Sequence, residues 1–559
     1  MSVPTLADSF RHLACLAEVR GDPGARTLRA VHTHLARLTP AALGALIEAA
    51  RAPSKPDLPD MDRPAADRVR EAVTLGAEPL IRAARARVPL LHRLLLERSA
   101  ITHDEAATLA RDHGVVTLAD LQAFLAEPRS SRLPAVMHAR LEGAASGLAA
   151  ELRPVPLGRA CEVLGACLEA TLRLAGVDAA MIAGDARRFE PLVDNLVLAA
   201  RSPHPSATVD AVTASRPVDD VLHRTARRAL VSVRGTEVDI RVAAPDEFGT
   251  MVFAATGAPG HVAHMRRRRS GLDLCAREED VYARAGLPWI PPELRNDSGE
   301  IEAALAGRLP RLVERTDIRG DLHMHSTYSD GQDTVEAMLR AAAALGYEYV
   351  AITDHSENAA ASRTMMPDQL ARQRDEIERL RPLFPSMEIL HGLEVDILQD
   401  GRLDCADAIL ERLDIVLASL HDHAGQGPEV LTRRCLRAIH HPLVNVITHP
   451  SNQLVGRRPG YSLDFEAIYA AAAETGTALE IDGAPSHLDL DGAHARAAVA
   501  AGVTVTIDSD CHRASGLERQ MTFGIGTARR GWVEARNVLN TRPMHEVKAF
   551  VRAKRVPVG

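Results

Sequence analysis

Two histidines spaced two residues apart are the first sign of chemistry in this sequence. His323 and His325 end a short apolar run, and Asp330 follows them on a turn that Gly331 permits. If the run is a β-strand, residues i and i+2 point to the same face, so both imidazoles can bind one metal ion. With 24 histidines in 559 residues, chance gives about one such pair. The pair therefore matters only if other ligands reach the same place.

Several β-rich runs between residues 317 and 559 end in metal-ligand residue types. Short apolar runs alternate there with helical stretches. The runs are Gly320–His325, Tyr349–His355, Glu388–Val395, Ile415–His421, Val444–His449, Ala478–Ile481 and Thr504–Asp508. This alternation predicts about seven βα units, whose parallel strands close into a barrel related to the (β/α)8 type.

The strand ends of such a barrel gather at one face, so their polar side chains should meet there. These ligand types are His323, His325, Asp330, His355, Glu394, His421, His449, Asp510 and His512. A core histidine is the ordinary interpretation of any one of them. That interpretation fails for the set, because buried histidines and carboxylates cost several kcal/mol unless they are paired or metal-bound. Nine nitrogen and oxygen ligands suit two or three ions of Zn²⁺ or Mn²⁺.

The composition argues against several other classes of protein. The chain is 46% hydrophobic and 25% charged, as ordinary soluble proteins are, and no run of about 18 apolar residues predicts a membrane span. A net charge of −8 and 3% aromatic residues argue against a strongly electrostatic or stacking nucleic-acid binder. Seven cysteines without Cys-x-x-Cys spacing, and no secretory signal, predict a cytoplasmic protein with no membrane partner. The oligomeric state stays open.

Two regions with different patterns precede the barrel. Residues 1–150 show helical periodicity and predict an all-helical domain. Residues 151–316 predict an α/β region with a helix at Ala160–Leu174 and strands at 179–183, 192–199 and 237–242. Asp194 and Asp239 lie on two of these strands. Two carboxylates can bind a metal weakly, but surface or turn acids are the ordinary interpretation.

The barrel motifs resemble the PHP (polymerase and histidinol phosphatase) family. They occur in the family's order as Asp-Leu-His-Met-His-Ser-Thr-Tyr-Ser-Asp-Gly331, Thr-Asp-His-Ser356, Gly-Leu-Glu394, Ser-Leu-His421, His-Pro450 and Asp-Cys-His512. The resemblance implies a distorted (β/α)7 barrel with a trinuclear centre. It implies a first ion on His323, His325, Glu394 and Asp510, a second on Glu394, His421 and His449, and a third on Asp330, His355 and His512.

The flanking sequence resembles bacterial family X DNA polymerases that carry a C-terminal PHP domain. Gly-Asp-Ala-Arg-Arg188 and Val-Asp-Ile-Arg-Val242 follow the polymerase palm, although the family's Ser before Arg-Arg is Asp185 here. The family's Asp-x-Asp pair falls on Asn195 and Val197, so only Asp239 remains of three carboxylates. One carboxylate cannot hold the two Mg²⁺ ions of phosphoryl transfer.

The resemblance therefore implies three regions. Residues 1–150 would be a degenerate 8-kDa, helix-hairpin-helix and fingers-like domain without the family's clamp glycines. Residues 151–316 would be a degenerate palm and thumb of α+β type. Residues 317–559 would be an intact PHP phosphoesterase domain, preceded by a polymerase part that has lost its activity.

The predicted function is metal-dependent hydrolysis of phosphoesters, as a 3′–5′ exonuclease or 3′-end phosphatase on DNA in repair. His323, His325, Glu394 and Asp510 would serve catalysis, with Arg457 or Arg458 stabilising phosphoryl charge. An alternative is a small-molecule phosphomonoesterase of the histidinol-phosphatase type. The family's Gly-Arg is Asn452-Gln453 here, and its Asn-Pro-x-Arg is Ala-Pro-Ser-His487, which favours an altered substrate. A third interpretation is a non-catalytic DNA-binding scaffold.

Overall fold

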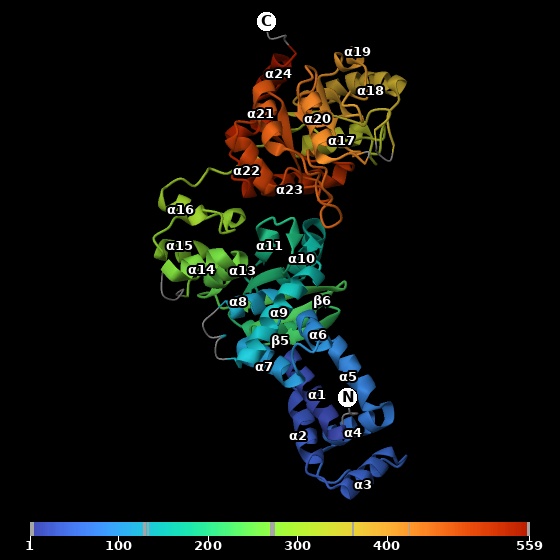
Figure 1. Cartoon of the computed structure of the whole chain (residues 1–559), viewed down its shortest axis with the longest axis vertical. Helices are drawn as coiled ribbons and strands as arrows, with labels where there is room; N and C mark the ends of the chain where they lie inside the picture. Colours follow the sequence, from blue (N-terminus) through green and yellow to red (C-terminus); the bar gives the residue numbers. More distant parts are fainter. Residues whose placement is uncertain are drawn as a thin grey trace. The chain divides into compact units, whose positions relative to one another are not determined.

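The computed structural model describes residues 5–126, 130, 133–268, 274–359, 363–423 and 425–555 (Figure 1). Its contacts divide the chain into two compact units. Unit 1 comprises Met1–Val155, Arg159–Ala186 and Val193–Gly286, and unit 2 comprises Pro156–Gly158, Arg187–Leu192 and Leu287–Gly559. The division into three regions at residues 150 and 316 stays a prediction, because these units describe contacts and not ancestry.

The N-terminal part of unit 1 is helical, as its periodicity predicts. Its helices are α1 (Leu6–Arg20), α2 (Ala25–Leu35), α3 (Pro40–Arg51), α4 (Arg63–Leu75), α5 (Ala77–Ala86), α6 (Leu90–Glu97), α7 (His103–His113), α8 (Leu118–Leu125) and α9 (Ala135–Glu151). α7 begins with a capping box, in which Thr102 and Glu105 each accept the other's backbone N–H. One apolar core surrounds Phe10 and Val69, and another surrounds Leu95 and Leu109.

A five-stranded mixed sheet forms the rest of unit 1. Its strands, in the order β2-β4-β7-β6-β5, are β2 (Ala179–Ala183), β4 (Leu196–Arg201), β7 (Thr236–Ala243), β6 (Arg228–Val233) and β5 (Asp220–Arg224). The helices are α10 (Leu157–Leu172), α11 (Gly184–Arg187), α12 (Pro205–Thr213), α13 (Phe248–Thr256), α14 (Pro259–Arg268) and α15 (Glu278–Arg284), some of which cross the boundary between the units. The strand predicted at 192–199 is two, β3 (Leu192–Val193) and β4, because the chain turns at residues 194 and 195. β1 (Val155–Pro156) is equally short.

Unit 2 holds the predicted parallel barrel. Seven strands follow one another in chain order, and every neighbouring pair is parallel. They are β8 (Gly320–Asp321), β9 (Tyr349–Ile352), β10 (Glu388–Asp396), β11 (Ile415–Ser419), β12 (Val446–Ile447), β13 (Ala478–Asp482) and β14 (Val505–Asp508). A single parallel bridge between Met324 and Cys511 joins the first strand end to the last. The ring is therefore nearly closed, which confirms the distorted (β/α)7 architecture.

Helices follow most of these strands, as βα units require. They are α17 (Val335–Ala344), α18 (Pro367–Leu380), α19 (Asp407–Leu410), α20 (Pro428–Ile439), α21 (Phe465–Thr475), α22 (Gly492–Ala500), α23 (Leu517–Arg530) and α24 (Met544–Ala553). Another helix, α16 (Glu300–Leu305), precedes the first barrel strand. Short 3₁₀ turns connect several of them, at Pro292–Leu294, Arg315–Asp317, Arg381–Leu383, Ala514–Gly516, Ala535–Asn537 and Leu539–Thr541.

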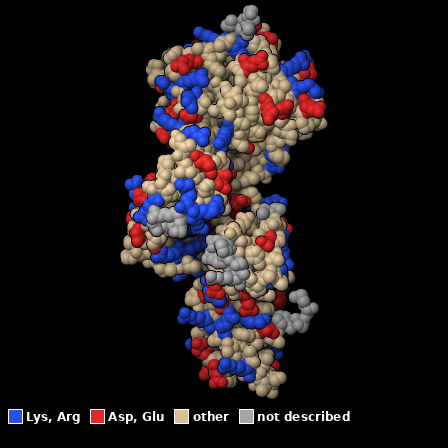
Figure 2. Space-filling view, turned by 60° about the vertical axis from the view of Figure 1, so that its left-hand side comes forward, with Lys and Arg blue, Asp and Glu red and all other residues tan. Residues whose placement is uncertain are grey.

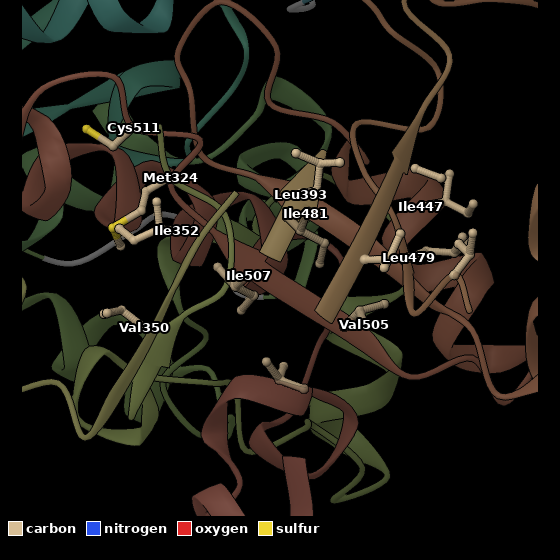
Figure 3. Close-up of a cluster of buried hydrophobic side chains, with 14 of the residues drawn as sticks. Met324, Val350, Ile352, Leu393, Ile447, Leu479, Ile481, Val505, Ile507 and Cys511 are labelled. Atoms are coloured by element: carbon tan, nitrogen blue, oxygen red, sulfur yellow. The ribbon is translucent and has the colours of Figure 1, made fainter. Parts of the chain in front are cut away.

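The apolar core of unit 2 is built from alternating strand residues. Figure 3 shows side chains from several strands within this core, among them Val350, Leu393, Ile481 and Ile507. Because side chains alternate along a strand, Leu393 faces this core while its neighbour Glu394 points to the opposite face. The barrel can therefore bury an apolar layer and still offer ligand side chains from the same strands.

The surface and the helices fit the composition. Figure 2 shows Lys and Arg interspersed with Asp and Glu over the visible face. Among the residues that the structure describes, every helix is too short or too polar to span a bilayer.

Candidate metal centre

The segment that carries His323 and His325 lies just beyond β8, which is shorter than predicted. β8 ends at Asp321, because the following backbone bonds to side chains: the N–H of Leu322 donates to the carboxylate of Asp508 at 2.7 Å. Around Met324 the chain stays extended, bridged to Cys511. Both histidines are fully buried, and their Nε2 atoms lie 3.1 Å apart.

The turn that carries Asp330 is fixed by the carboxylate of Asp354. Asp354 accepts the N–H groups of Ser326 and Ser329 at 2.8 and 3.0 Å, and the Ser326 hydroxyl at 2.6 Å. Gly331 is required at the end of this turn, since a Cβ atom there would lie 2.6 Å from backbone atoms of Ser326. The aspartate of Thr-Asp-His-Ser therefore positions a ligand from another strand.

Glu394, at the centre of the site, is fully buried between five imidazoles. Three ring nitrogens face its Oε2 atom: His355 Nδ1 at 2.9 Å, His323 Nε2 at 3.4 Å and His325 Nε2 at 3.5 Å. Two face its Oε1 atom: His449 Nε2 at 3.0 Å and His421 Nε2 at 3.3 Å. Each oxygen thus has its own set of imidazoles, which is the arrangement of a carboxylate that bridges two cations.

All nine predicted ligands meet in this part of the barrel. Three groups have one ligand atom from each residue within 4.8 Å of the others. The groups are His323, His325 and Asp510; His355, Glu394 and His421; and His325, Asp330, His355 and His512. His449 joins them through its contact with Glu394. Zinc–nitrogen bonds of about 2.0–2.1 Å in a tetrahedron separate ligand atoms by about 3.3 Å, so the observed spacings suit ions of this size.

The contacts inside the site fit shared ions better than hydrogen bonds. Glu394 Oε2 and His355 Nδ1 lie 2.9 Å apart, yet within the described chain neither atom has a partner in hydrogen-bonding geometry. Two atoms that both point toward one shared metal ion produce a short contact of this kind. The donor set of imidazoles and carboxylates is also one that Zn²⁺ and Mn²⁺ accept.

The electrostatic field of the site favours positive charge. Burial alone would lower the pKa of His421, but Glu394 and Asp396 outweigh it and raise that pKa to about 10. In the same way Asp510 and Asp330 outweigh burial at His512 and raise its pKa to about 9. The carboxylates that hold protons on these imidazoles would equally hold metal cations.

Two carboxylates that orient the ligands were not predicted. Glu480 Oε1 lies 2.7 Å from His323 Nδ1, and its Oε2 accepts the N–H of His449 at 2.8 Å. Asp396 Oδ1 lies 2.5 Å from His421 Nδ1. Such carboxylates fix the tautomer and the ring orientation of ligating histidines. Their signal in the sequence was an acidic residue on an otherwise apolar strand.

The two predicted arginines lie on the loop after His449. Arg458 donates to the carbonyl of Asn452 at 2.8 Å, and the Asn452 amide donates to the carbonyl of His421 at 2.9 Å. The Arg458 side chain is thus linked, through Asn452, to the backbone of the loop that carries His421. Arg457 is exposed. Their catalytic role stays a prediction.

Three ligands mark the open side of the centre. The side chains of Asp330, His421 and His512 keep 14%, 15% and 32% of their surface exposed, whereas those of His323, His325 and Glu394 keep none. A substrate would therefore reach the ions from the side of these three residues.

The position in unit 1 where the resemblance implies a degenerate polymerase site has a different environment. Asp239 is paired with Val197 across β4 and β7 and is fully buried. Arg228 donates to both of its oxygens at 2.7 and 2.8 Å, and Arg241 donates to Oδ2 at 2.9 Å. Burial would raise the pKa of Asp239, but the two guanidinium groups lower it to about 2. Arg228 also binds Asp120 of α8 at 2.8 Å.

Asp185 is the residue that the resemblance places at the family's serine. Its Oδ2 atom accepts the backbone N–H groups of Asp194 and Asn195 at 3.0 and 3.4 Å. A carboxylate therefore stands where the resemblance implies a side chain that faces a nucleotide triphosphate, and like charge there would repel one.

Comparisons with known proteins show what this chain is similar to. The PHP domain family matches residues 321–474. The chain is 37% identical over 334 residues to the DNA polymerase/3′–5′ exonuclease PolX of Bacillus subtilis, a match that covers 57% of this chain and 58% of that protein. It is 31% identical to a probable phosphatase of Caldanaerobacter subterraneus over 34% of this chain and 75% of that protein. A histidinol phosphate phosphatase of Lactococcus lactis matches 38% of this chain and 93% of its own at 18% identity, with a TM-score of 0.32. The chain thus belongs to the PHP family, and it spans just over half the length of the polymerase/exonuclease that it resembles.

Proposed function

We propose that this protein is a metal-dependent phosphoesterase that acts on DNA 3′ ends, as a 3′–5′ exonuclease or a 3′-phosphatase. The arrangement of five imidazoles around the two oxygens of Glu394 carries the proposal. The B. subtilis relative, named as a 3′–5′ exonuclease, supports the choice of DNA. Its cytoplasmic location and the use of Zn²⁺ or Mn²⁺, two or three ions in all, belong to the same proposal.

The nine ligands would hold the ions in the division that the resemblance implies, with Glu394 shared between the first and second. Bound there, the ions would supply Lewis acidity to a water molecule and to the phosphoryl oxygens. Glu480 and Asp396 keep the rings of His323 and His421 in place, so that little reorganisation is needed when substrate arrives. Arg458 or Arg457 would balance phosphoryl charge at the rim.

The proposal includes the loss of polymerase activity. Two Mg²⁺ ions need several carboxylate oxygens, but Val197 is apolar and both oxygens of Asp239 already accept guanidinium donors. An ion at Asp239 would have to displace Arg228 and Arg241, whose charges then oppose it. These contacts support a structural role for the remaining carboxylate.

A small phosphomonoester is the second candidate substrate, and two side chains near the centre favour it. The Asn452 amide donates to the carbonyls of Leu420 and His421, and the Gln453 amide donates to the carbonyl of Leu488 at 2.9 Å. Both side chains bond inside the protein, whereas the family's arginine could reach a DNA backbone. A non-catalytic scaffold, the third candidate, does not explain nine converging ligands.

The test compares substrates on full-length protein loaded with Mn²⁺ or Zn²⁺. A 3′-recessed duplex, a duplex with a 3′-phosphate and a nucleotide-sized monoester would be assayed at equal concentration. Preference for the DNA substrates supports the main proposal, and preference for the monoester supports the second. Failure to hydrolyse any of the three would refute both.

His323→Ala links the activity to the site. It should remove at least one ion and nearly all hydrolysis, because His323 contacts both Glu394 and Asp510. His545→Ala on α24 is the matched control, since that imidazole is 81% exposed. An unchanged rate in His323→Ala would place the chemistry elsewhere.

A further inference from the structure

A fourth group of ligand-type side chains adjoins the nine-residue centre. Asp482, His487 and Asp510 each place one ligand atom within 4.8 Å of the other two. Asp510 also belongs to the group with His323 and His325, so the two groups share this carboxylate. Asp482 and His487 are outside the ligand set that the family resemblance implies.

The pairing of β13 with β14 brings this group together. Asp482 ends β13 opposite Asp508 of β14, and Asp510 follows two residues later with φ 47°, in the left-handed region. A tight turn then brings His487 back toward its own strand. The N–H of Ala484 donates to Asp482 Oδ1 at 2.6 Å, and the N–H of His487 donates to the Ala484 carbonyl at 2.9 Å. Non-glycine residues in this backbone region concentrate at functional sites.

Two atoms of the group are buried without a hydrogen-bond partner among the residues that the structure describes. They are Oδ2 of Asp482, whose side chain is fully buried, and Nδ1 of His487. The His487 ring stacks on His449 with ring centroids 5.2 Å apart. An imidazole whose buried Nδ1 atom has no hydrogen-bond partner among the described residues can offer that nitrogen to a metal ion.

Negative charge from buried carboxylates surrounds this group and favours a bound cation. Asp482 lies near Asp510 and Glu480, two further buried carboxylates. Buried carboxylates of this kind need a positive partner. The family's arginine would supply one at residue 487, where this chain has a histidine instead. The substitution exchanges a fixed positive charge for a neutral metal ligand.

We propose that Asp482, His487 and Asp510 bind a further divalent ion, Zn²⁺ or Mn²⁺, in addition to those of the nine-residue centre. The oxygen and nitrogen donors suit both metals. Asp510 would bridge this ion to the group of His323 and His325. The added ion would place positive charge beside His449, where the resembled family presents a guanidinium.

The test counts ions on the full-length protein after loading with Zn²⁺ and removal of the excess, by native and elemental mass spectrometry. His487→Ala and Asp482→Asn should each bind one ion fewer than the natural protein. His487→Arg should also lose this ion, but its guanidinium group replaces the positive charge that the ion supplied. This variant therefore guards against misfolding of the other two. His545→Ala, exposed on α24, should bind the full number.

Two results would overturn the proposal. Variants of His487 and Asp482 that bind as many ions as the natural protein would show that the group is only polar packing. Loss of two or more ions in His487→Arg would show that these residues belong to one indivisible centre. Because the count needs no substrate, a protein inactive on every phosphoester would refute the proposed function and leave this result intact.

Discussion

Two buried carboxylates, Glu394 in the barrel and Asp239 in the palm-like sheet, have opposite surroundings. Glu394 faces five imidazoles, groups that can release a proton and bind a metal. Asp239 faces Arg228 and Arg241, whose guanidinium groups stay protonated and cannot ligate an ion. The comparison shows that a carboxylate at a family's catalytic position can take part in catalysis only if its neighbours leave its oxygens free to bind a metal ion.

The largest expected effect is at Glu394. Glu394→Gln removes the shared negative charge while keeping its size, so both ion sets that it bridges should weaken. We expect phosphoester hydrolysis to fall by more than about 100-fold, beyond the 10–100-fold typical of residues that only orient ligands. Rate and bound metal would be measured together. If the variant keeps its ions and its rate, Glu394 is not the bridging ligand, and the contrast with Asp239 disappears.

Asp239→Asn should affect stability and leave hydrolysis unchanged. The substitution leaves two guanidinium groups facing a neutral amide in a buried site, and removing one partner of such a pair costs about 3 kcal/mol. Denaturant unfolding would measure the loss, and phosphoesterase assays would serve as the control. A contrary result would be template-directed nucleotide incorporation by the natural protein that is lost in Asp239→Ala. That result would contradict a purely structural role for Asp239.

Asp396→Asn tests whether carboxylates around the barrel ligands act through them. Asp396 touches His421 and is itself buried, so the change should loosen the ring and lower metal affinity by about 10–100-fold. Titration with a competing chelator would report the affinity. Asp400→Asn is the matched control, since Asp400 lies on the following loop with its side chain 50% exposed.

The smallest expected effect is a pH dependence at Asp239. Its pKa falls from 3.8 to about 2 on folding, so the pair stabilises the folded state above pH 3.8 and loses that contribution as the pH falls toward 2. The full contribution is about 2 kcal/mol, and roughly 1 kcal/mol of it should be gone at pH 3. The stability difference between the natural protein and Asp239→Asn, measured at pH 5 and pH 3, should shrink accordingly. A constant difference would mean that the two arginines do not hold the carboxylate ionised.

Much of the barrel and its ligands could be predicted from the sequence. Seven apolar runs became seven parallel strands because each run is short and β-rich, and their order along the chain is their order in the barrel. The nine candidate ligands could be named because His323, Glu394 and the others follow those runs, where strand ends converge. The predicted strand limits were less accurate. β8 ends two residues before His323, because the N–H of Leu322 donates to the carboxylate of Asp508 and not to a neighbouring strand.

What the sequence alone determined is therefore the kind of chemistry: residue types at strand ends specify a metal centre, because a barrel brings those ends together. What only the tertiary structure decided is which groups surround each carboxylate. The sequence did not show that Glu480 and Asp396 would hold the rings of His323 and His421. Nor did the spacing of Arg228 and Arg241 show that both would bind Asp239. These contacts depend on the register of neighbouring strands and on side-chain direction, and both are set only when the sheet is packed.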